Sequence, residues 1–394
     1  MQPHRRITVA VGVSMFVDAA LYLAVLPLLP HYVHRFGLST LQAGIVLAAY
    51  SVSIPVVSIA CIVLVPRIGA RRITLFSAVL MTVATVVFAW APTALILTLA
   101  RFLQGTASGS IWTASMSWVT DNAPPGQRGR ESGIVMGLLS AGSVAGPAIG
   151  ALASLVGSGI AFGAVAAVSA AGVVLTLAAP AGHAVEIERD VAGAIKRGAR
   201  QPATRAAIAL ATVDLLAFGA VDLLVPIQAG RHGESVVTIG IALAAGAILG
   251  AVVGPFAGRL VDRVGPPRVA AWAGLGVLAI PVVLAFTPPV EVQLALLVVG
   301  GPLFSVVGAA MFPLSTLGAD AARVSHVTVT GLMGAVWAGG FTLVPLVVGL
   351  VADHTSPGAA YALVAGLGAL VAVILARNVR RTRAAAPALA APEA

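Results

Sequence analysis

The chain has 394 residues, of which 59% are hydrophobic and only 9% are charged, and its mean hydropathy is +1.01. Soluble globular domains carry about 25% charged residues, so this composition excludes a cytosolic enzyme, a secreted domain and a disordered protein. The net charge of +9 would suggest a nucleic-acid partner in a soluble protein. Here the basic residues lie at the ends of apolar runs, so we expect a protein integrated in a lipid bilayer, with no nucleic-acid partner.

Twelve apolar segments are long enough to cross a hydrocarbon core about 30 Å thick as helices. The expected spans are 7–30, 41–65, 73–91, 94–119, 131–156, 159–180, 205–228, 236–261, 268–287, 291–315, 326–351 and 357–377. The first one is too long for a signal peptide and carries Asp18, so we expect it to be retained. The sequence therefore predicts an all-α membrane protein with twelve transmembrane helices.

Basic residues indicate the orientation of these spans. With the N-terminus in the cytoplasm, the inner loops and termini hold twenty of the 23 Lys and Arg residues, and only Arg35 and Arg231 lie outside. This distribution satisfies the positive-inside rule. We expect a multi-pass protein of a bacterial inner membrane with both termini in the cytoplasm.

Two six-helix halves repeat one another along the chain. Asp18 and Asp214 lie at equal distances before Gly69 and Gly265, the glycines of the loops "PRIGARR" and "DRVGPPR". We expect an N-terminal half over 1–180, a cytoplasmic linker with a short surface helix over 181–204, a C-terminal half over 205–377 and a disordered tail over 378–394. Such duplicated halves place a binding site between them, near the midplane of the membrane.

Asp18 is the strongest candidate for a functional acid. It follows Arg6 by twelve helical residues, about 18 Å, which places it near the middle of the bilayer. An ionised carboxylate there costs several kcal/mol unless it is paired, hydrated or protonated. We interpret Asp18 as a proton or cation site, with Tyr22 one turn further along the same face; a helix–helix hydrogen bond that only fixes packing is the alternative.

The second half contributes two acids of its own. Asp214 is well inside span seven and is a candidate for proton coupling, and Asp222 lies nearer the outer end of the same helix. Both are candidates for the substrate cavity. For Asp222, a hydrated residue of the outer vestibule is the alternative.

Arg101 is the one basic residue expected at membrane depth. Because arginine stays cationic, it needs a carboxylate, water or backbone partner, and Asp18 is the expected counter-charge. Gln104 lies one turn away on the same face, so we place both residues in the substrate cavity. Simple structural anchoring is the alternative for Arg101.

Glycines at every fourth position form flat ridges on two helices. Span five contains Gly142, Gly146 and Gly150 with Pro147, and span eight contains a matching series that ends at Gly258. Small residues at this spacing let helices approach closely. We expect the two ridges to form the interface at which the halves rock, with generic packing as the alternative.

In combination, these motifs resemble the major facilitator superfamily, and within it the twelve-span drug:proton antiporters. Residues 101–105 resemble its span-four motif through Arg101, Gln104 and Gly105, and "GPAIG" with Gly146 and Pro147 resembles its antiporter motif. The loop "GRLVDRVG", which includes Gly258, Asp262, Arg263 and Gly265, resembles its loop motif. The first-half copy of that loop has Ile62 and Pro66 where the family has glycine and aspartate.

The resemblance implies proton-coupled export of small, largely apolar or cationic molecules by alternating access. It implies a role for Arg101 in proton coupling and for the span-five motif in blocking leak. The partners expected are the substrate, protons and lipid, with a monomeric chain, no cofactor, no metal site and no enzymatic activity. A sugar or metabolite exporter, an uptake symporter and a non-transporting membrane sensor remain as alternatives.

Overall fold

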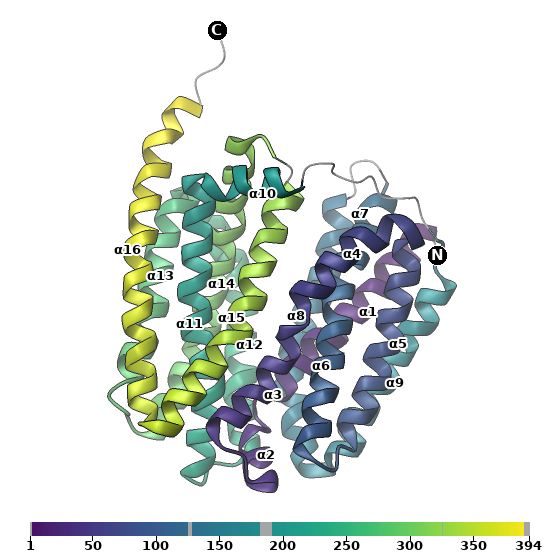
Figure 1. Cartoon of the computed structure of the whole chain (residues 1–394), viewed down its shortest axis with the longest axis vertical. Helices are drawn as coiled ribbons and strands as arrows, with labels where there is room; N and C mark the ends of the chain where they lie inside the picture. Colours follow the sequence, from purple (N-terminus) through teal and green to yellow (C-terminus); the bar gives the residue numbers. More distant parts are fainter. Residues whose placement is uncertain (1, 125–127, 182–190, 325, 390–394) are drawn as a thin grey trace. The chain divides into compact units, whose positions relative to one another are not determined.

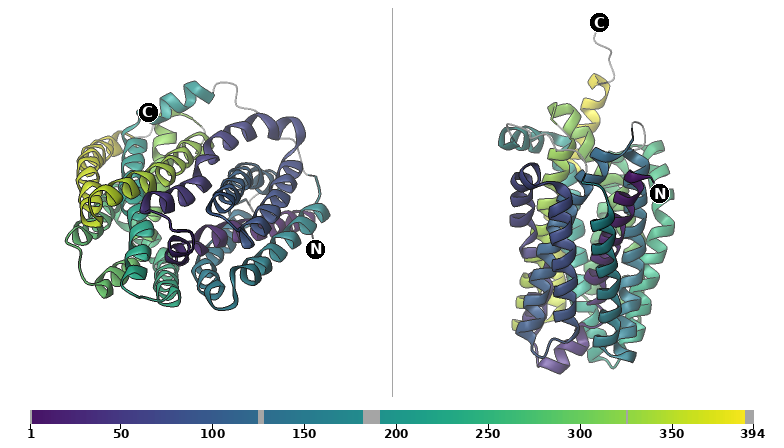
Figure 2. Two further views of the ribbon diagram at one scale, coloured as in Figure 1. Left: turned by 60° about the horizontal axis from the view of Figure 1, so that its bottom comes forward. Right: turned by 90° about the vertical axis from the view of Figure 1, so that its right-hand side faces the viewer.

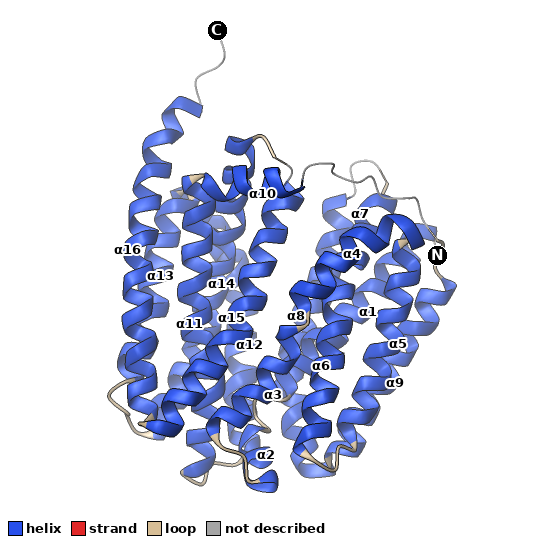
Figure 3. Ribbon diagram, in the orientation of Figure 1, coloured by secondary structure: helices blue, strands red, loops and turns tan. Residues whose placement is uncertain are grey.

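The structure is a computed structural model that describes residues 2–124, 128–181, 191–324 and 326–389. Within these ranges every regular element is a helix and no strand occurs (Figure 3). The chain divides into two compact units. Unit 1 comprises Met1–Ile187 and Pro226–Ala244, and unit 2 comprises Glu188–Val225 and Ala245–Ala394. The predicted all-α fold is confirmed.

The elements follow one another as in Figure 1. The first ten are α1 (Pro3–Ala24), α2 (Leu29–Phe36), α3 (Thr40–Val52), α4 (Ile54–Ile68), α5 (Ala70–Ala89), α6 (Ala94–Ser110), the π-helix η1 (Ile111–Ser115), α7 (Met116–Asn122), α8 (Arg128–Val156) and α9 (Ser158–Ala178). The remaining seven are α10 (Val191–Arg200), α11 (Pro202–Arg231), α12 (Val236–Val264), α13 (Pro266–Leu284), α14 (Val290–Ala322), α15 (His326–His354) and α16 (Pro357–Leu389).

Eleven helical stretches of the described chain are long and apolar enough to cross a membrane. The remaining expected span, the fourth (94–119), is built from the consecutive elements α6, η1 and α7, each of which is too short alone. Large apolar side chains are exposed along these helices, among them Val56, Leu155 and Leu370. Exposed apolar surface of this extent is typical of a face covered by lipid.

Prolines and two glycines explain where the observed helices depart from the expected spans. The first span ends at Ala24 rather than at residue 30, because Pro27 and Pro30 cannot donate backbone hydrogen bonds to a continuing helix. The second span is divided at Ser53, just before Pro55. Between the second and third spans of each half, the chain turns at Gly69 and Gly265.

These two glycines adopt almost the same backbone conformation, with φ of 91° and 92°. This left-handed region favours glycine, because a side chain would be strained there. The repeat recognised in the sequence is thus also a repeat of local backbone geometry.

The end of the chain differs from the expectation. α16 continues to Leu389, so the segment from residue 378 that was expected to be disordered is helical over most of its length. The run of Ala and Arg after the last span explains the extension, since both residues favour helix. Residues 390–394 lie outside the described residues.

Within unit 1, α1 packs along α8 and α9 (Figure 2). Within unit 2, α10 lies within the segment expected as a linker and contacts the ends of α14 and α15. The core of unit 2 consists largely of small and branched side chains from α11, α13 and α14, and α12, α15 and α16 contribute Val261, Met333, Leu375 and Val379. Among the eleven stretches, α1 and α11 are the most enclosed. In their most apolar segments 67% and 78% of the residues are buried, against 50% or less in the other nine stretches. These two helices carry the three acids singled out from the sequence.

Candidate functional site

Asp18 lies in α1 with its carboxylate buried in unit 1. The hydroxyl group of Tyr50 in α3 donates to Oδ1. The indole Nε1–H of Trp112 in η1 donates to Oδ2 at 3.1 Å. Each carboxylate oxygen therefore has a donor from a different aromatic side chain, so the acid is buried but not unsatisfied.

Arg101 in α6 is completely buried in the same unit. Its Nη1 donates to the carbonyl oxygen of Leu21 at 3.2 Å and to Oε1 of Gln104 at 3.1 Å. The guanidinium carbon lies 4.3 Å from the ring centroid of Tyr50 and 5.9 Å from that of Tyr22. Nε and Nη2 have no hydrogen-bond partner among the described residues. The cation is thus held partly by hydrogen bonds and partly by aromatic faces.

Asp18 and Arg101 do not form the direct ion pair expected from the sequence. Among the described residues, no carboxylate oxygen of Asp18 lies within 4.0 Å of a guanidinium nitrogen of Arg101. Tyr50 contacts both instead, with its hydroxyl on the acid and its ring against the cation. Its ring also packs against that of Tyr22, with centroids 5.2 Å apart.

The backbone explains how Tyr50 reaches this position. A Cβ atom added to Gly105 would lie 1.6 Å from the carbonyl oxygen of Tyr50. Only glycine allows α3 and α6 to approach this closely, so the motif glycine of span four places Tyr50 beside Arg101. Trp112 lies in a π-helical turn, a local widening of the helix that is frequent at functional sites.

Gln104 links the same group to α5. Its Nε2 donates to Oγ1 of Thr85 at 3.4 Å, and Thr85 donates in turn to the carbonyl oxygen of Met81 at 2.7 Å. The predicted residues Asp18, Tyr22, Arg101 and Gln104 therefore meet in one cluster. The sequence reasoning missed Tyr50 and Trp112, although an aromatic side chain with a polar tip inside an apolar span is a signal that could have found them.

Asp214 and Asp222 belong to α11 in unit 2 and are both buried. Asp214 lines a cavity of about 20 Å³ together with Phe218, Phe304 and apolar residues of α13. This volume is sufficient for one water molecule. Oδ2 of Asp222 has no hydrogen-bond partner within the described chain. No basic side chain described by the structure forms an ion pair with either acid, so their surroundings differ from those of Asp18.

The glycine ridge of span five packs inside unit 1. Cβ atoms added to Gly142, Gly146 and Gly150 would lie 2.2 to 2.7 Å from carbonyl oxygens of α1, at Phe16, Ala20 and Ala24. The carbonyl oxygen of Pro147 and the side chain of Ala151 border Gly240 of α12, which is also counted in unit 1.

The glycine ridge of span eight packs inside unit 2. Gly246 and Gly250 face α14, at Leu297, Val298 and Gly301, whereas Gly254 and Gly258 have no described atom within 4 Å of an added Cβ. Each ridge therefore allows a close approach within its own unit, and the interface at which the two ridges would let the halves rock stays a prediction. In the loop motif that follows, Asp262 and Arg263 are exposed and Gly265 forms the turn into α13.

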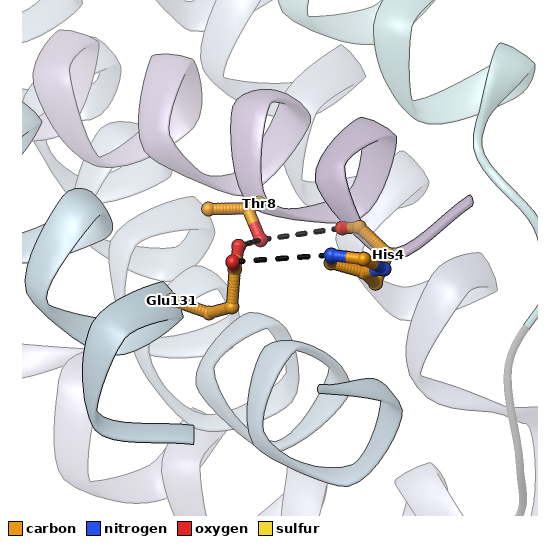
Figure 4. A network of polar contacts seen from close by, with 3 residues as sticks. All are labelled: His4, Thr8 and Glu131. Atoms are coloured by element: carbon orange, nitrogen blue, oxygen red, sulfur yellow. Dashed lines mark hydrogen bonds and ion pairs between the residues drawn. The ribbon is translucent and has the colours of Figure 1, made fainter. Parts of the chain in front are cut away.

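A second polar cluster fastens α1 to α8 near the N-terminus (Figure 4). Oγ1 of Thr8 lies 2.5 Å from Oε2 of the buried Glu131, and Nε2 of His4 lies 4.0 Å from Oε1 of the same residue. Glu131 gives no signal of its own in the sequence, because it stands at the expected beginning of a span, where a charged residue is ordinary.

Comparison with known proteins identifies the family. The family model described as Major Facilitator Superfamily matches residues 11–329 and 216–393. The chain belongs to the Major Facilitator Superfamily. Members of this superfamily are membrane transporters, and the eleven apolar helical stretches of the described residues agree with a multi-pass membrane protein.

Solved Major Facilitator Superfamily structures share the fold. A bacterial homologue of the human lysosomal transporter Spinster, inward-facing and unoccupied, superposes with a TM-score of 0.72 and 17% identity, covering 97% of this chain and 94% of that one. The human organic anion transporter MFSD10 (TETRAN) superposes with a TM-score of 0.68 and 17% identity, covering 95% of this chain and 100% of that one.

Curated relatives match over shorter segments. The MFS-type transporter ppzB of Metarhizium rileyi is 30% identical over 147 residues, which is 36% of this chain and 30% of that protein. The quinolone resistance protein NorA of Staphylococcus aureus is 26% identical over 125 residues, which is 32% of each chain. The match thus spans less than a third of the length of these relatives.

Proposed function

We propose that this Major Facilitator Superfamily protein is a proton-coupled antiporter of a bacterial inner membrane, with both termini cytoplasmic, that exports small apolar or cationic molecules by alternating access. The observation that carries the proposal is the buried carboxylate of Asp18, held by neutral donors rather than by a fixed salt bridge. A carboxylate without a permanent counter-charge can exchange a proton for a cation.

Competition for one acid explains how export and proton entry are coupled in this proposal. When Asp18 is protonated, its negative charge is absent and a cationic molecule is released. When Asp18 is ionised, the carboxylate attracts the next cation. Asp214 and Asp222 are proposed as further proton or substrate contacts, because both are buried acids without a basic partner in the described chain.

The relatives support the drug-export proposal at low identity. NorA is named for quinolone resistance and shares 26% of its sequence with this chain over the matched segment. The Gly146-Pro147 pair, which resembles the antiporter motif, also favours antiport over uptake by symport.

An organic anion is a second candidate for the substrate. Two nitrogen atoms of the buried Arg101, Nε and Nη2, have no hydrogen-bond partner among the described residues, and a guanidinium group binds carboxylates well. The fold neighbour MFSD10 is titled an organic anion transporter.

The test uses purified protein in liposomes that contain a pH-sensitive dye, with ethidium as the cationic probe and taurocholate as the anionic one. We expect an ethidium gradient to drive proton movement in the wild type and not in the Asp18→Asn variant. Glu291→Gln is the matched control, since it makes the same change at an exposed acid. Proton movement that is equal in Asp18→Asn and the wild type would refute the role of Asp18. Coupling to taurocholate alone would favour the second candidate.

A further inference from the structure

Tyr50 is the side chain of unit 1 that contacts both charged groups of the cluster. Its hydroxyl group donates to Oδ1 of Asp18, and its ring lies against the guanidinium group of Arg101. It is 3% exposed, and its backbone is held against Gly105. The ring is therefore fixed, and the freedom left to this side chain is the direction of its O–H bond.

The two aromatic donors to Asp18 differ in what they can do when the acid takes up a proton. The indole Nε1–H of Trp112 can only donate, whereas the hydroxyl group of Tyr50 can donate or accept. A protonated oxygen needs an acceptor opposite it. Tyr50 can provide one by turning its own hydrogen away, and Trp112 cannot.

We propose that Asp18 takes up its proton on the oxygen that faces Tyr50, and that the Tyr50 hydroxyl then reverses from donor to acceptor while Trp112 continues to donate to the other oxygen. This assignment rests on the proposed function, because it specifies the proton site of the antiporter. It makes Tyr50 a positioning residue for proton coupling, a role that the span-four and span-five motifs do not assign.

Atoms balance in this step with a hydronium ion as the only further reactant. A hydronium ion of the solvent gives one proton to Oδ1 of Asp18, so an O–H bond breaks in the hydronium ion, which becomes water, and one forms on the carboxyl group. The new O–H donates to the phenolic oxygen of Tyr50. The hydroxyl group of Ser108 borders both Asp18 and Tyr50 and can accept the hydrogen that Tyr50 turns away.

Arg101 and Gly105 have a defined part in the switch. The cation against the face of the Tyr50 ring opposes a swing of that ring, and the close backbone contact at Gly105 leaves no room for Tyr50 to move toward α6. Protonation of Asp18 therefore changes a hydrogen-bond direction rather than a side-chain position. The hydrogen bond between Asp18 and Tyr50 can therefore reverse while both side chains stay buried.

Infrared difference spectroscopy of the purified protein between about pH 4 and about pH 10 tests the assignment. It needs no transported molecule, because the proton is the probe. A carbonyl band that is lost in Asp18→Asn reports the protonated acid. If the proton is on the Tyr50 side, the carbonyl oxygen is the one that accepts from Trp112. Trp112→Phe then moves the band to higher frequency, since a carbonyl that loses its donor stiffens.

Tyr50→Phe keeps the ring and its contact with Arg101, but it removes the hydroxyl group that can change from donor to acceptor. We expect the band frequency to stay near that of the wild type and the midpoint of its pH titration to shift by about one pH unit. Ser108→Ala, which keeps Tyr50, provides a second variant and should shift the midpoint less.

Three results would overturn the proposal. They are a band raised by Tyr50→Phe and not by Trp112→Phe, a midpoint that neither Tyr50→Phe nor Ser108→Ala moves, and the absence of an Asp18 band over the whole range. Failure of the proposed function is distinct, because it would appear as a wild-type protein whose Asp18 titrates normally but whose liposomes show no proton-coupled flux.

Discussion

Asp18 and Asp222 are both buried acids, but the structure gives them different surroundings. Asp18 accepts from two aromatic donors, whereas Oδ2 of Asp222 has no partner in the described chain. A hydrogen bond to a charged group contributes about 1.5–3 kcal/mol, and an unpaired buried charge costs stability. We expect Asp18→Asn to lower the melting temperature in detergent by a few degrees and Asp222→Asn to leave it unchanged or raise it.

The melting temperatures of the two variants are measured by thermal unfolding, with the fluorescence of a dye that does not react with thiols as the signal. Glu291→Gln, an exposed acid-to-amide change, gives the baseline. A larger loss of stability in Asp222→Asn than in Asp18→Asn would show that Asp222 has a stabilising partner and would contradict the description of its site.

His31 is a titratable residue that we expect to have no effect on the pH dependence of transport. It lies in the short helix α2, outside the spans, beside Tyr32. Partial burial, with the nearby charges of Arg35 and His34, lowers the pKa of His31 below its usual value of 6.5. The ring is therefore neutral at pH 7 and becomes charged only at a more acidic pH than a free histidine.

His31→Gln should consequently leave the pH profile of proton-driven flux unchanged between about pH 6.5 and about pH 8. The measurement is the initial rate of the liposome assay at a series of external pH values. A displaced midpoint in this variant would mean that His31 takes part in proton sensing.

At the scale of the helix, the seam between α1 and α8 depends on which glycines face it. An added Cβ at Gly142 would lie 2.2 Å from the carbonyl oxygen of Phe16, whereas one at Gly137 of the same helix would meet no described atom within 4 Å. Alanine at position 142 must separate the two backbones. Alanine at position 137 only removes the conformational freedom of glycine, which stabilises a helix by about 0.5–1 kcal/mol.

Gly142→Ala and Gly137→Ala should therefore have opposite signs in thermal unfolding, with the first variant less stable than the wild type and the second slightly more stable. Both variants replace glycine by alanine in the same helix, so the gain in helix propensity is the same in both and cancels when they are compared. Equal effects would show that the seam does not depend on close backbone approach.

The sequence was sufficient for the elements whose signal is local and insufficient for those that depend on tertiary contacts. Apolar length predicted the spans, and equal spacing from Gly69 and Gly265 predicted the repeat. The pattern of α3 contains Tyr50 as an aromatic residue with a polar tip inside an apolar span, but it could not place that residue between Asp18 and Arg101, because this position follows from the close approach at Gly105. Likewise, glycine spacing showed that span five would pack closely but could not show that α1 was its neighbour.

At the scale of the whole chain, the distribution of arginine makes a prediction about orientation in the membrane. Translocating basic residues against the positive-inside bias is unfavourable, and twenty of the 23 basic residues fall on the side that we assign to the cytoplasm. The chain has a single cysteine, Cys61, which is buried. Cys61→Ala therefore gives a background in which one new cysteine reports one position.

Two exposed positions, expected on opposite sides of the membrane, test this orientation. In that background, we expect His232→Cys, in the loop between α11 and α12, to react with a membrane-impermeant thiol reagent added to intact cells. Arg380→Cys in α16 should react only after the membrane is permeabilised. Unsubstituted Cys61→Ala protein controls for non-specific labelling. The reverse labelling pattern would show that every span has the opposite orientation, because all spans are joined in one chain. The proposed direction of export would then be reversed as well.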